Sequence, residues 1–358
     1  MKKTLIVTGG GTGGHLFAGI SIADAWKNKF PDSRILFIGA RGAIEERMVP
    51  KAGYPLDVLK LSALKSVSLR KRIVSLLRIP LSLFQSGRIL IREKPYAVIG
   101  VGGYASGPVV LVSKIVGWIW GCRVAILEQN AVPGFTNKIL GFFSNTVFCA
   151  FPGIEKHFNQ KKCIVTGNPV RKEILFFESA PRSPFVIFIF GGSQGAMGIN
   201  SLVLDFLKIS PELKDLIEII HQTGERDFER ISADYKSLSF KVRVEKFIYD
   251  MPECYKKSSL VICRSGSSTL AEIATAGRAA ILIPFPQAAD NHQEKNARLF
   301  TDVGAALLLI QGTAQAEDLK KIILDLMASP DQIENMETRV HRFQKQDAAD
   351  QIASILGA

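Results

Sequence analysis

Five glycines precede a histidine directly behind the first apolar run. Residues 7–20 read VTGGGTGGHLFAGI, with the last two glycines of this group, Gly13 and Gly14, immediately before His15. Glycine lets the backbone pass close to a ligand, and the amides at a helix N-terminus favour an anion. This loop is therefore a candidate phosphate site, although a tight turn between strand and helix would use the same glycines.

His15 falls in the first turn of the helix expected after this loop. The positive end of the helix dipole disfavours imidazolium, so the ring stays neutral and can accept a proton. A neutral histidine in a cleft is a candidate general base. The alternative is that His15 only caps the turn.

A second candidate anion site is rich in hydroxyl groups. Ser265, Ser267, Ser268 and Thr269 lie in CRSGSSTLAEIATAG, residues 263–277, where a helix is expected to begin. Their hydroxyls and amides could hold a diphosphate. Thr269 and Glu272 also fit a capping box, and a capping glutamate cannot be told from a ribose-binding one by spacing.

A polar loop follows at residues 287–297, QAADNHQEKNA. Its amide and carboxylate groups, Asp290, Asn291 and Gln293 with His292 beside them, suit sugar hydroxyls, as they would suit a solvated loop. The chain has no Asp-x-Asp and its histidines are far apart, so no catalytic metal is expected. Amides, hydroxyls and Arg171 or Arg264 would then stabilise a leaving phosphate.

Two common nucleotide motifs are absent. The glycines can be aligned with GxGxxG, but RILFIGARG offers no acidic residue at the end of the second strand, and no Lys-Ser/Thr pair follows as in a P-loop. A dinucleotide site and a P-loop site are therefore not expected.

Apolar runs of strand type alternate with helical patterns along the chain, which predicts an α/β protein with parallel sheets. The pattern of strand, glycine turn and helix begins again at residues 184–207. We expect a first domain over 1–165, a second over 166–335, and a C-terminal helical segment, 336–358, that packs back toward the first domain.

The positive charge is concentrated in the first half, where residues 1–170 hold 23 Lys and Arg against 8 Asp and Glu. Residues 60–94 alone hold nine basic residues and one acid, with apolar residues between them, which favours an anionic membrane surface over nucleic acid. An ordinary surface helix is the alternative. The expected membrane contacts are Arg70, Lys71, Arg72, Leu76, Ile79, Phe84 and Trp118.

The start of the chain is too short in apolar residues for a secretory signal, and no stretch is long enough to cross a membrane. The five cysteines form no CxxC pair and are expected to be reduced thiols in the cytosol.

Seven motifs, in order and spacing, resemble the MurG family of peptidoglycan N-acetylglucosaminyltransferases: GGGTGGH, GVGGYASGP, EQNAVPGFTNK, TGNPVR, FGGSQGA, CRSGSSTLAEIATAG and DNHQEKNA. The resemblance implies a GT-B fold, in which two Rossmann-like domains with parallel sheets face a central cleft. It also implies transfer of GlcNAc from UDP-GlcNAc to lipid I, the undecaprenyl-diphosphate-linked muramyl pentapeptide, on the cytoplasmic face of the inner membrane. No cofactor or nucleic acid is implied, and cell-wall synthesis proteins are potential partners.

The resemblance also assigns site residues. His15 matches the family's proposed base. The donor residues would be Thr12, Gly13, Gly14, Asn130, Arg171, Ser193, Ile248, Ser267, Ser268, Thr269, Glu272 and Gln293, with Ile248 offering its backbone to uracil and Glu272 binding ribose. The acceptor diphosphate would be bound by Gly102, Gly103 and Tyr104.

The sequence departs from the family at two positions near the acceptor, where Leu127 replaces a histidine and Ala18 a proline. Two other functions remain open: a GT-B transferase acting on a different lipid acceptor, and a nucleotide-sugar-binding protein without activity. The second predicts that His15 is dispensable.

Overall fold

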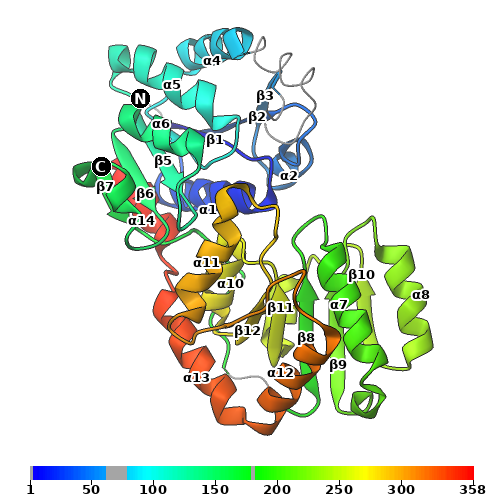
Figure 1. The fold of residues 1–358 in the computed structure, drawn as a ribbon. Coiled ribbons are helices and arrows are strands. Elements are labelled where there is room, and N and C mark those ends of the chain that lie inside the picture. Colours follow the sequence, from blue (N-terminus) through cyan, green and yellow to red (C-terminus); the bar gives the residue numbers. More distant parts are fainter. Residues whose placement is uncertain (1–2, 62–78, 179–181) are drawn as a thin grey trace. The chain divides into compact units, whose positions relative to one another are not determined.

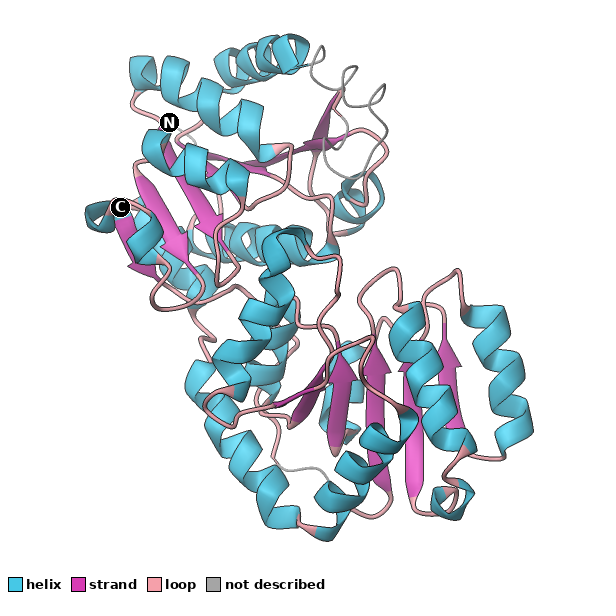
Figure 2. Ribbon diagram, in the orientation of Figure 1, coloured by secondary structure: helices cyan, strands magenta, loops and turns pink. Residues whose placement is uncertain are grey.

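The computed structural model describes residues 3–61, 79–178 and 182–358, and divides into two compact units (Figure 1). The first unit comprises Met1–Arg171 and Lys345–Ala358, and the second comprises Lys172–Gln344. Each is built around a single parallel sheet with helices on both faces (Figure 2).

The first sheet has the strand order β3-β2-β1-β4-β5-β6-β7. Its elements are β1 (Thr4–Thr8), α1 (Gly13–Lys29), β2 (Arg34–Ala40), α2 (Glu45–Lys51), β3 (Leu56–Leu59), α4 (Ile79–Glu93), β4 (Ala97–Gly100), α5 (Ser106–Val116), β5 (Arg123–Glu128), α6 (Phe135–Phe143), β6 (Thr146–Cys149), β7 (Cys163–Val165) and α14 (Ala348–Gly357). Three 3-10 turns, η1 (Gly117–Trp120), η2 (Glu155–His157) and η3 (Gln160–Lys162), lie in its connections.

The second sheet has the order β10-β9-β8-β11-β12-β13. Its elements are β8 (Phe185–Phe190), α7 (Met197–Lys208), η4 (Pro211–Leu213), β9 (Ile217–Gln222), α8 (Phe228–Leu238), β10 (Lys241–Glu245), α9 (Met251–Lys257), β11 (Leu260–Cys263), α10 (Ser267–Ala276), β12 (Ala280–Leu282), η5 (Ala289–Asn291), α11 (His292–Thr301), β13 (Leu307–Leu308), α12 (Ala316–Ala328), α13 (Pro330–Val340) and η6 (His341–Phe343). The predicted α/β class with two Rossmann-like parallel sheets is confirmed.

Both sheets reverse their strand order at one point, and the glycine-rich loops leave the sheets there. β1 pairs with β4 at Thr8 and Gly100, and β8 pairs with β11 at Phe190 and Cys263. Ligands of open α/β sheets bind at the carboxyl ends of the strands at such a switch point. The topology thus brings the loops after β1 and β4 together in one unit, and those after β8 and β11 together in the other.

The central strands are apolar along their whole length because helices cover both faces of each sheet. In the first unit, α1 and α14 pack on one face around Trp26, Ile22 and Leu356, and α4 and α5 cover the other around Leu90 and Val109. Ala18 and Leu127, the two departures from the family pattern, are also buried in the first of these clusters.

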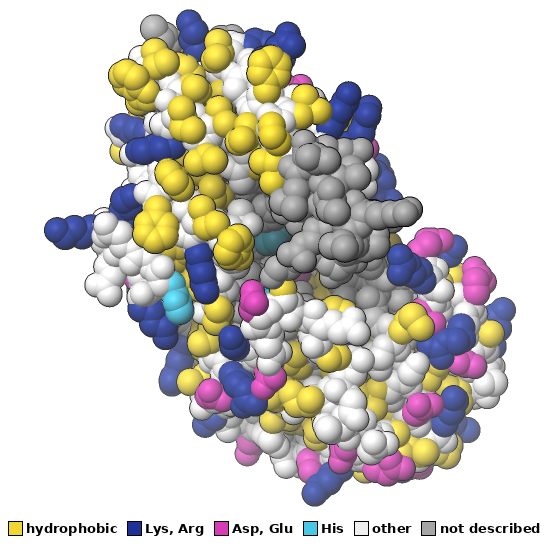
Figure 3. All heavy atoms as spheres, turned by 45° about the horizontal axis from the view of Figure 1, so that its top comes forward, with side chains coloured by type: hydrophobic (Ala, Val, Ile, Leu, Met, Phe, Trp, Pro, Cys, Tyr) yellow, Lys and Arg dark blue, Asp and Glu magenta, His cyan; other side chains and the backbone are white. Residues whose placement is uncertain are grey.

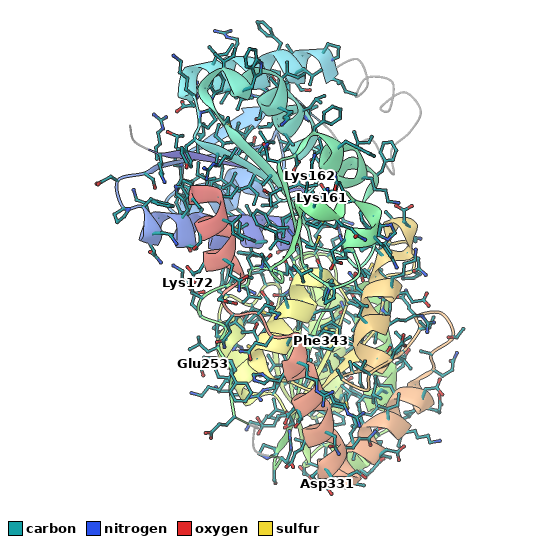
Figure 4. The ribbon with its side chains drawn as sticks, turned by 90° about the vertical axis from the view of Figure 1, so that its left-hand side faces the viewer. Lys161, Lys162, Lys172, Glu253, Asp331 and Phe343 are labelled. Atoms are coloured by element: carbon teal, nitrogen blue, oxygen red, sulfur yellow. The ribbon has the colours of Figure 1, made fainter. Side chains whose placement is uncertain are left out.

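The unit boundaries fall later in the chain than the sequence placed them. The Thr166 N–H donates to the Cys149 carbonyl, and the Ser21 hydroxyl donates to the Val170 carbonyl, so residues 166–171 stay with the first unit. At the other boundary, Met336 lies in the core of the second unit. Phe343, labelled in Figure 4, stacks on Phe300 of α11 at 4.2 Å between ring centroids.

The C-terminal segment is therefore not one helix but the end of α13, the turn η6 and the separate helix α14. α13 remains in the second unit, and only α14 packs against α1 of the first. Ile352 and Leu356 of α14 complete the core on that side of the sheet.

Candidate active site

The first glycine loop turns its amides inward. Gly9, Gly10 and Gly11 have φ of 140°, 133° and 82°, a region that favours glycine. The Gly10 N–H donates to the Gly102 carbonyl at 3.1 Å, and the Gly11 N–H donates to Glu45 Oε1 at 2.7 Å. The Gly10 and Gly11 amides therefore fix the loop. The backbone at Gly13 and Gly14, the two glycines expected to bind the donor, forms the first turn of α1.

The three residues expected to bind the acceptor pack directly against this loop. A Cβ on Gly103 would overlap the Gly10 carbonyl, and a Cβ on Gly102 would lie 2.8 Å from His15 Nε2. The ring of Tyr104 lies over Gly11, where a Cβ would come within 3.2 Å of its Cε1. The structure thus brings Gly102, Gly103 and Tyr104 together with His15.

His15 is held at the start of α1 through its Nδ1. That nitrogen lies 3.2 Å from Thr12 Oγ1 and 3.3 Å from the Gly10 carbonyl oxygen. A carbonyl can only accept, so the contact with Gly10 is a hydrogen bond in the tautomer that carries the proton on Nδ1, and in that tautomer Nε2 is the basic nitrogen. Thr12, whose hydroxyl accepts from the His15 N–H, is the N-cap of α1, and His15 lies in the first turn.

Two buried glutamates organise this unit, and the sequence analysis missed both. Glu45 is 1% exposed, and burial raises the pKa of its carboxyl. It lies beyond the end of β2, in the first turn of α2, so its reach to the glycine loop has no signature in spacing.

Glu128, at the end of β5, fixes the loop that carries Asn130. Its carboxylate accepts from the Asn130 N–H at 2.9 Å and the Asn130 amide at 3.3 Å, and also from Gly134 and Asn137. Burial raises the pKa of Glu128, and these hydrogen bonds oppose the rise. Its place in the EQN motif was the available signal.

Arg171 is the last donor residue expected in this unit. Its guanidinium lies 4.8 Å from the centroid of the Phe17 ring, on the same helix as His15. Arg171 is therefore tied to α1 by a cation–π contact.

The glycine loop of the second unit is supported by a buried polar network. Gly195 has φ of 76° and packs so closely on the Thr223 carbonyl that a Cβ would overlap it. The Asn200 amide donates to the same carbonyl at 3.0 Å, and its oxygen lies 3.0 Å from His221 Nε2. Contacts with Thr223 and Asn200 thus fix the loop that carries Ser193.

Gln222 joins two of the expected donor residues. Its amide nitrogen donates to the Gly192 carbonyl at 2.9 Å, beside Ser193, and its oxygen accepts from the Ile248 N–H at 2.8 Å. The backbone of Ile248 was expected to contact uracil, and in this structure its N–H is bonded to Gln222. The sequence analysis did not single out Gln222.

The serine-rich turn begins α10, with Gly266 as its N-cap and no side-chain cap. Ser267, Ser268 and Thr269 occupy the first turn, so Glu272 lies too far along the helix to close a capping box, and that alternative is wrong. The Glu272 carboxylate, 7% exposed, accepts from the Tyr255 hydroxyl at 3.1 Å.

Gln293 is tied to this turn. The Ser265 hydroxyl donates to the Gln293 carbonyl at 2.8 Å, and the Asn296 amide donates to the Ser265 carbonyl at 3.2 Å. The Gln293 side-chain oxygen accepts from the Phe285 N–H, so its amide N–H₂ is the part that could bind a sugar. His292 Nδ1 lies 2.8 Å from the Ala289 carbonyl.

The Arg264 side chain, a candidate for binding the leaving phosphate, makes hydrogen bonds to other parts of the second unit. Its guanidinium donates to the carbonyls of Ile283 and Pro284 and to Gln311, and burial lowers its pKa to about 10. In the described ranges, no three His, Cys, Asp or Glu residues cluster as metal ligands would.

The first unit carries a face of exposed apolar side chains (Figure 3). Phe84 of α4, Trp118 of η1 and Phe142 of α6 are 63%, 76% and 82% exposed. Ile79, at the start of α4, is partly buried. The expected contacts Arg70, Lys71, Arg72 and Leu76 lie outside the described residues. Within the described ranges, no helix has the length and hydropathy to span a membrane.

Both units match models of one glycosyltransferase family. Residues 5–149 match the N-terminal domain of glycosyltransferase family 28, and residues 186–352 match its C-terminal domain. The chain also resembles a crystal structure of MurG from Acinetobacter baumannii, with a TM-score of 0.78 and 27% identity over 99% of both chains. A UDP-GlcNAc 2-epimerase from Neisseria meningitidis shares the fold at 13% identity and a TM-score of 0.67. The class is thus a family 28 glycosyltransferase with the GT-B fold.

Two curated relatives are named UDP-N-acetylglucosamine--N-acetylmuramyl-(pentapeptide) pyrophosphoryl-undecaprenol N-acetylglucosamine transferase. The protein from Myxococcus xanthus is 41% identical over 99% of this chain and 92% of its own length. The protein from Citrifermentans bemidjiense is 41% identical over 98% of both chains. The chain belongs to this family of N-acetylglucosamine transferases, the MurG family.

Proposed function

We propose that this chain transfers GlcNAc from UDP-GlcNAc to the undecaprenyl-pyrophosphate-linked N-acetylmuramyl pentapeptide, the lipid I to lipid II step of peptidoglycan synthesis. The observation that carries the proposal is the match, at 41% identity over 99% of the chain, to a protein named for this transfer. Features within each unit support the proposal: His15 beside the glycine loop in the first unit, and hydroxyl-rich turns in the second.

His15 Nε2 acts as the general base. It takes the proton of the muramyl 4-hydroxyl as the oxygen bonds to the anomeric carbon of GlcNAc, and the bond from that carbon to the UDP oxygen breaks with its electron pair leaving on UDP. Attack opposite the leaving group inverts the anomeric centre.

The second unit holds the leaving diphosphate and the donor sugar. Ser193 and the first turn of α10, with Ser267, Ser268 and Thr269, offer hydroxyls and helix amides that favour negative charge. Glu272 binds ribose hydroxyls and Gln293 binds the sugar. We expect no metal requirement, so EDTA should leave the rate unchanged.

We infer that the exposed apolar face of the first unit lies on the membrane from the cytoplasmic side. Phe84, Trp118 and Phe142 would enter the interface, with Lys114 and Lys138 beside them on α5 and α6. Aromatic side chains with basic neighbours are typical of such surfaces. This face would bring the enzyme to its lipid acceptor.

The proposed activity is tested by incubating the protein with UDP-GlcNAc and a lipid I analogue and measuring UDP release. Release that depends on the acceptor, with a disaccharide product, supports the proposal. Tight UDP-GlcNAc binding without release would favour a nucleotide-sugar-binding protein. Release only with a different lipid acceptor would favour another GT-B transferase.

A further inference from the structure

We propose that Glu45 is a positioning residue for His15 and acts through the peptide group between Gly10 and Gly11. The inference rests on the proposed function, since it concerns the base of that reaction. It adds a carboxylate that neither the motifs nor the family resemblance assigned.

One planar peptide group connects the two side chains. The Gly11 N–H donates to Glu45 Oε1 at 2.7 Å. The carbonyl of the same peptide group, that of Gly10, lies 3.3 Å from His15 Nδ1. Because the amide is rigid and conjugated, the carboxylate, the peptide and the imidazole form one hydrogen-bonded chain.

Such a chain is cooperative. A carboxylate that accepts from an amide N–H increases the negative charge on the carbonyl oxygen of that amide, which strengthens the next hydrogen bond. The Gly10 carbonyl therefore holds the proton on Nδ1 more firmly and keeps Nε2 basic. When Nε2 takes a proton, the same chain stabilises the imidazolium.

Two glycines leave the space that the Glu45 side chain occupies. A Cβ on Gly10 would overlap the carboxylate, and a Cβ on Gly39 would come within 3.1 Å of the Glu45 Cβ. Two positions without side chains thus make room for one buried glutamate.

Stability alone does not explain a glutamate here. Its second oxygen, Oε2, is buried and has no hydrogen-bond partner among the described residues. A buried carboxylate with an unpaired oxygen is costly, and an apolar or neutral side chain of similar shape is often as stable or more so. A functional demand for the charge accounts for its presence.

Two other titratable groups among the described residues interact with Glu45. Glu46 is its exposed neighbour on α2, and its charge adds to the rise in the pKa of Glu45. Tyr104 comes from the loop after β4, and burial and the charge of Glu45 raise its pKa. Both must be considered in any pH profile.

The test compares Glu45→Gln with Glu46→Gln, which removes a charge from the same helix but does not face the loop. We expect Glu45→Gln to lower kcat by about tenfold, the scale for losing a partner that orients a functional histidine. The KM for UDP-GlcNAc should not change. Without the carboxylate the imidazolium is less stable, so the acidic limb of the pH–rate profile moves to lower pH. Glu46→Gln should match the wild type in kcat and in the KM for UDP-GlcNAc.

A second measurement does not depend on activity. The ¹⁵N shifts of the histidine rings report which nitrogen carries the proton, and His15→Gln assigns the resonance. We expect the Nδ1–H form of His15 to dominate in the wild type and to lose population in Glu45→Gln. Glu45→Asp has a shorter side chain that no longer reaches the Gly11 N–H, so it should behave like Glu45→Gln. With two variants, the test remains decisive if one of them folds poorly.

An unchanged kcat, pH profile and tautomer in both Glu45 variants would overturn the inference, provided that the wild type releases UDP and His15→Ala does not. A wild type without UDP release, or a fully active His15→Ala, would instead overturn the proposed function. The two failures are therefore distinguishable.

Discussion

The two units use a histidine beside a glycine loop in opposite ways. His15 in the first unit is half-buried, and its Nδ1 lies 3.3 Å from the Gly10 carbonyl oxygen. His221 in the second unit is fully buried between the Tyr235 hydroxyl and Asn200, and burial lowers its pKa to about 3. The same side chain is thus a candidate base in one unit and a neutral support in the other. Burial and the nature of the partners decide which.

The groups that fix the two glycine loops also differ in charge. In the first unit a buried carboxylate accepts from the loop, whereas in the second neutral amides, of Asn200 and Gln222, fix it. A carboxylate directly on the loop suits a base that must become positive, whereas in the second unit the Asp227 carboxylate contacts Asn200 and not the loop itself. The difference favours the assignment of acceptor chemistry to the first unit and donor binding to the second.

The largest expected effect is that of His15→Ala. Loss of a general base lowers turnover by about 10²-fold or more. The KM for UDP-GlcNAc should change little, because the second unit binds most of the donor. UDP release is the measurement, and His157→Ala, an exposed histidine of the same unit, is the control. Wild-type turnover in His15→Ala would contradict the assignment of His15 as the general base, and both histidines would then be structural.

His221 should appear in the pH dependence of stability instead. The folded protein keeps it neutral down to a pKa of about 3, whereas in the unfolded chain it is protonated below about pH 6.5. Between these two pH values the unfolded state binds one more proton than the folded state. The free energy of unfolding therefore falls by about 1.4 kcal/mol for each unit by which the pH is lowered.

Urea unfolding of the wild type and His221→Gln between pH 7 and pH 5 tests this. In His221→Gln the free energy of unfolding should depend less on pH than in the wild type. Replacing the exposed His341 by glutamine should leave the pH dependence unchanged. Tyr235 and Asp227 are the titratable groups near His221, and Arg230 holds the pKa of Asp227 below its usual range. Equal slopes in the wild type and His221→Gln would contradict the assignment.

Glu272→Gln sharpens the comparison from the donor side. Charged hydrogen bonds are worth about 1.5–3 kcal/mol, so losing the ribose contact should raise the KM for UDP-GlcNAc by about tenfold or more. The unfolding midpoint should change little, because glutamine can still accept from Tyr255. Glu253→Gln, an exposed residue labelled in Figure 4, is the control. An unchanged KM would make Glu272 structural.

The smallest effect concerns the membrane face. Lys138→Gln, on α6 beside Phe142, should weaken binding to anionic vesicles about fivefold, since one basic residue near the surface contributes about 1 kcal/mol. Cosedimentation with vesicles containing phosphatidylglycerol measures it. Lys236→Gln in the second unit should have no effect. Equal losses in both variants would mean that no particular face is used.

Much of the site was accessible from the sequence because its motifs are local. The glycines, His15 and the serine-rich turn lie within single strand–turn–helix segments, whose geometry follows from the spacing. The alternation of apolar runs likewise predicted the two parallel sheets, because strands buried on both faces must be apolar throughout.

Partners that meet through the tertiary structure were not accessible. Glu45 reaches Gly11 and Gln222 bonds Ile248 through contacts between segments that share no spacing rule. The contact of Glu128 with Asn130 lies within the EQN motif and could have been found there. The inward turn of the Gly10 and Gly11 amides was missed for the same reason. The α10 cap was misjudged because the helix begins at Ser267, which depends on where β11 ends.

The sequence by itself determined the class of fold, the family and the residues able to exchange a proton or hold a phosphate, because each depends on local order. Only the tertiary structure decided which histidine is buried and which carboxylate fixes the first glycine loop. Those properties depend on hydrogen-bond partners and solvent access, which exist only once distant segments have packed together.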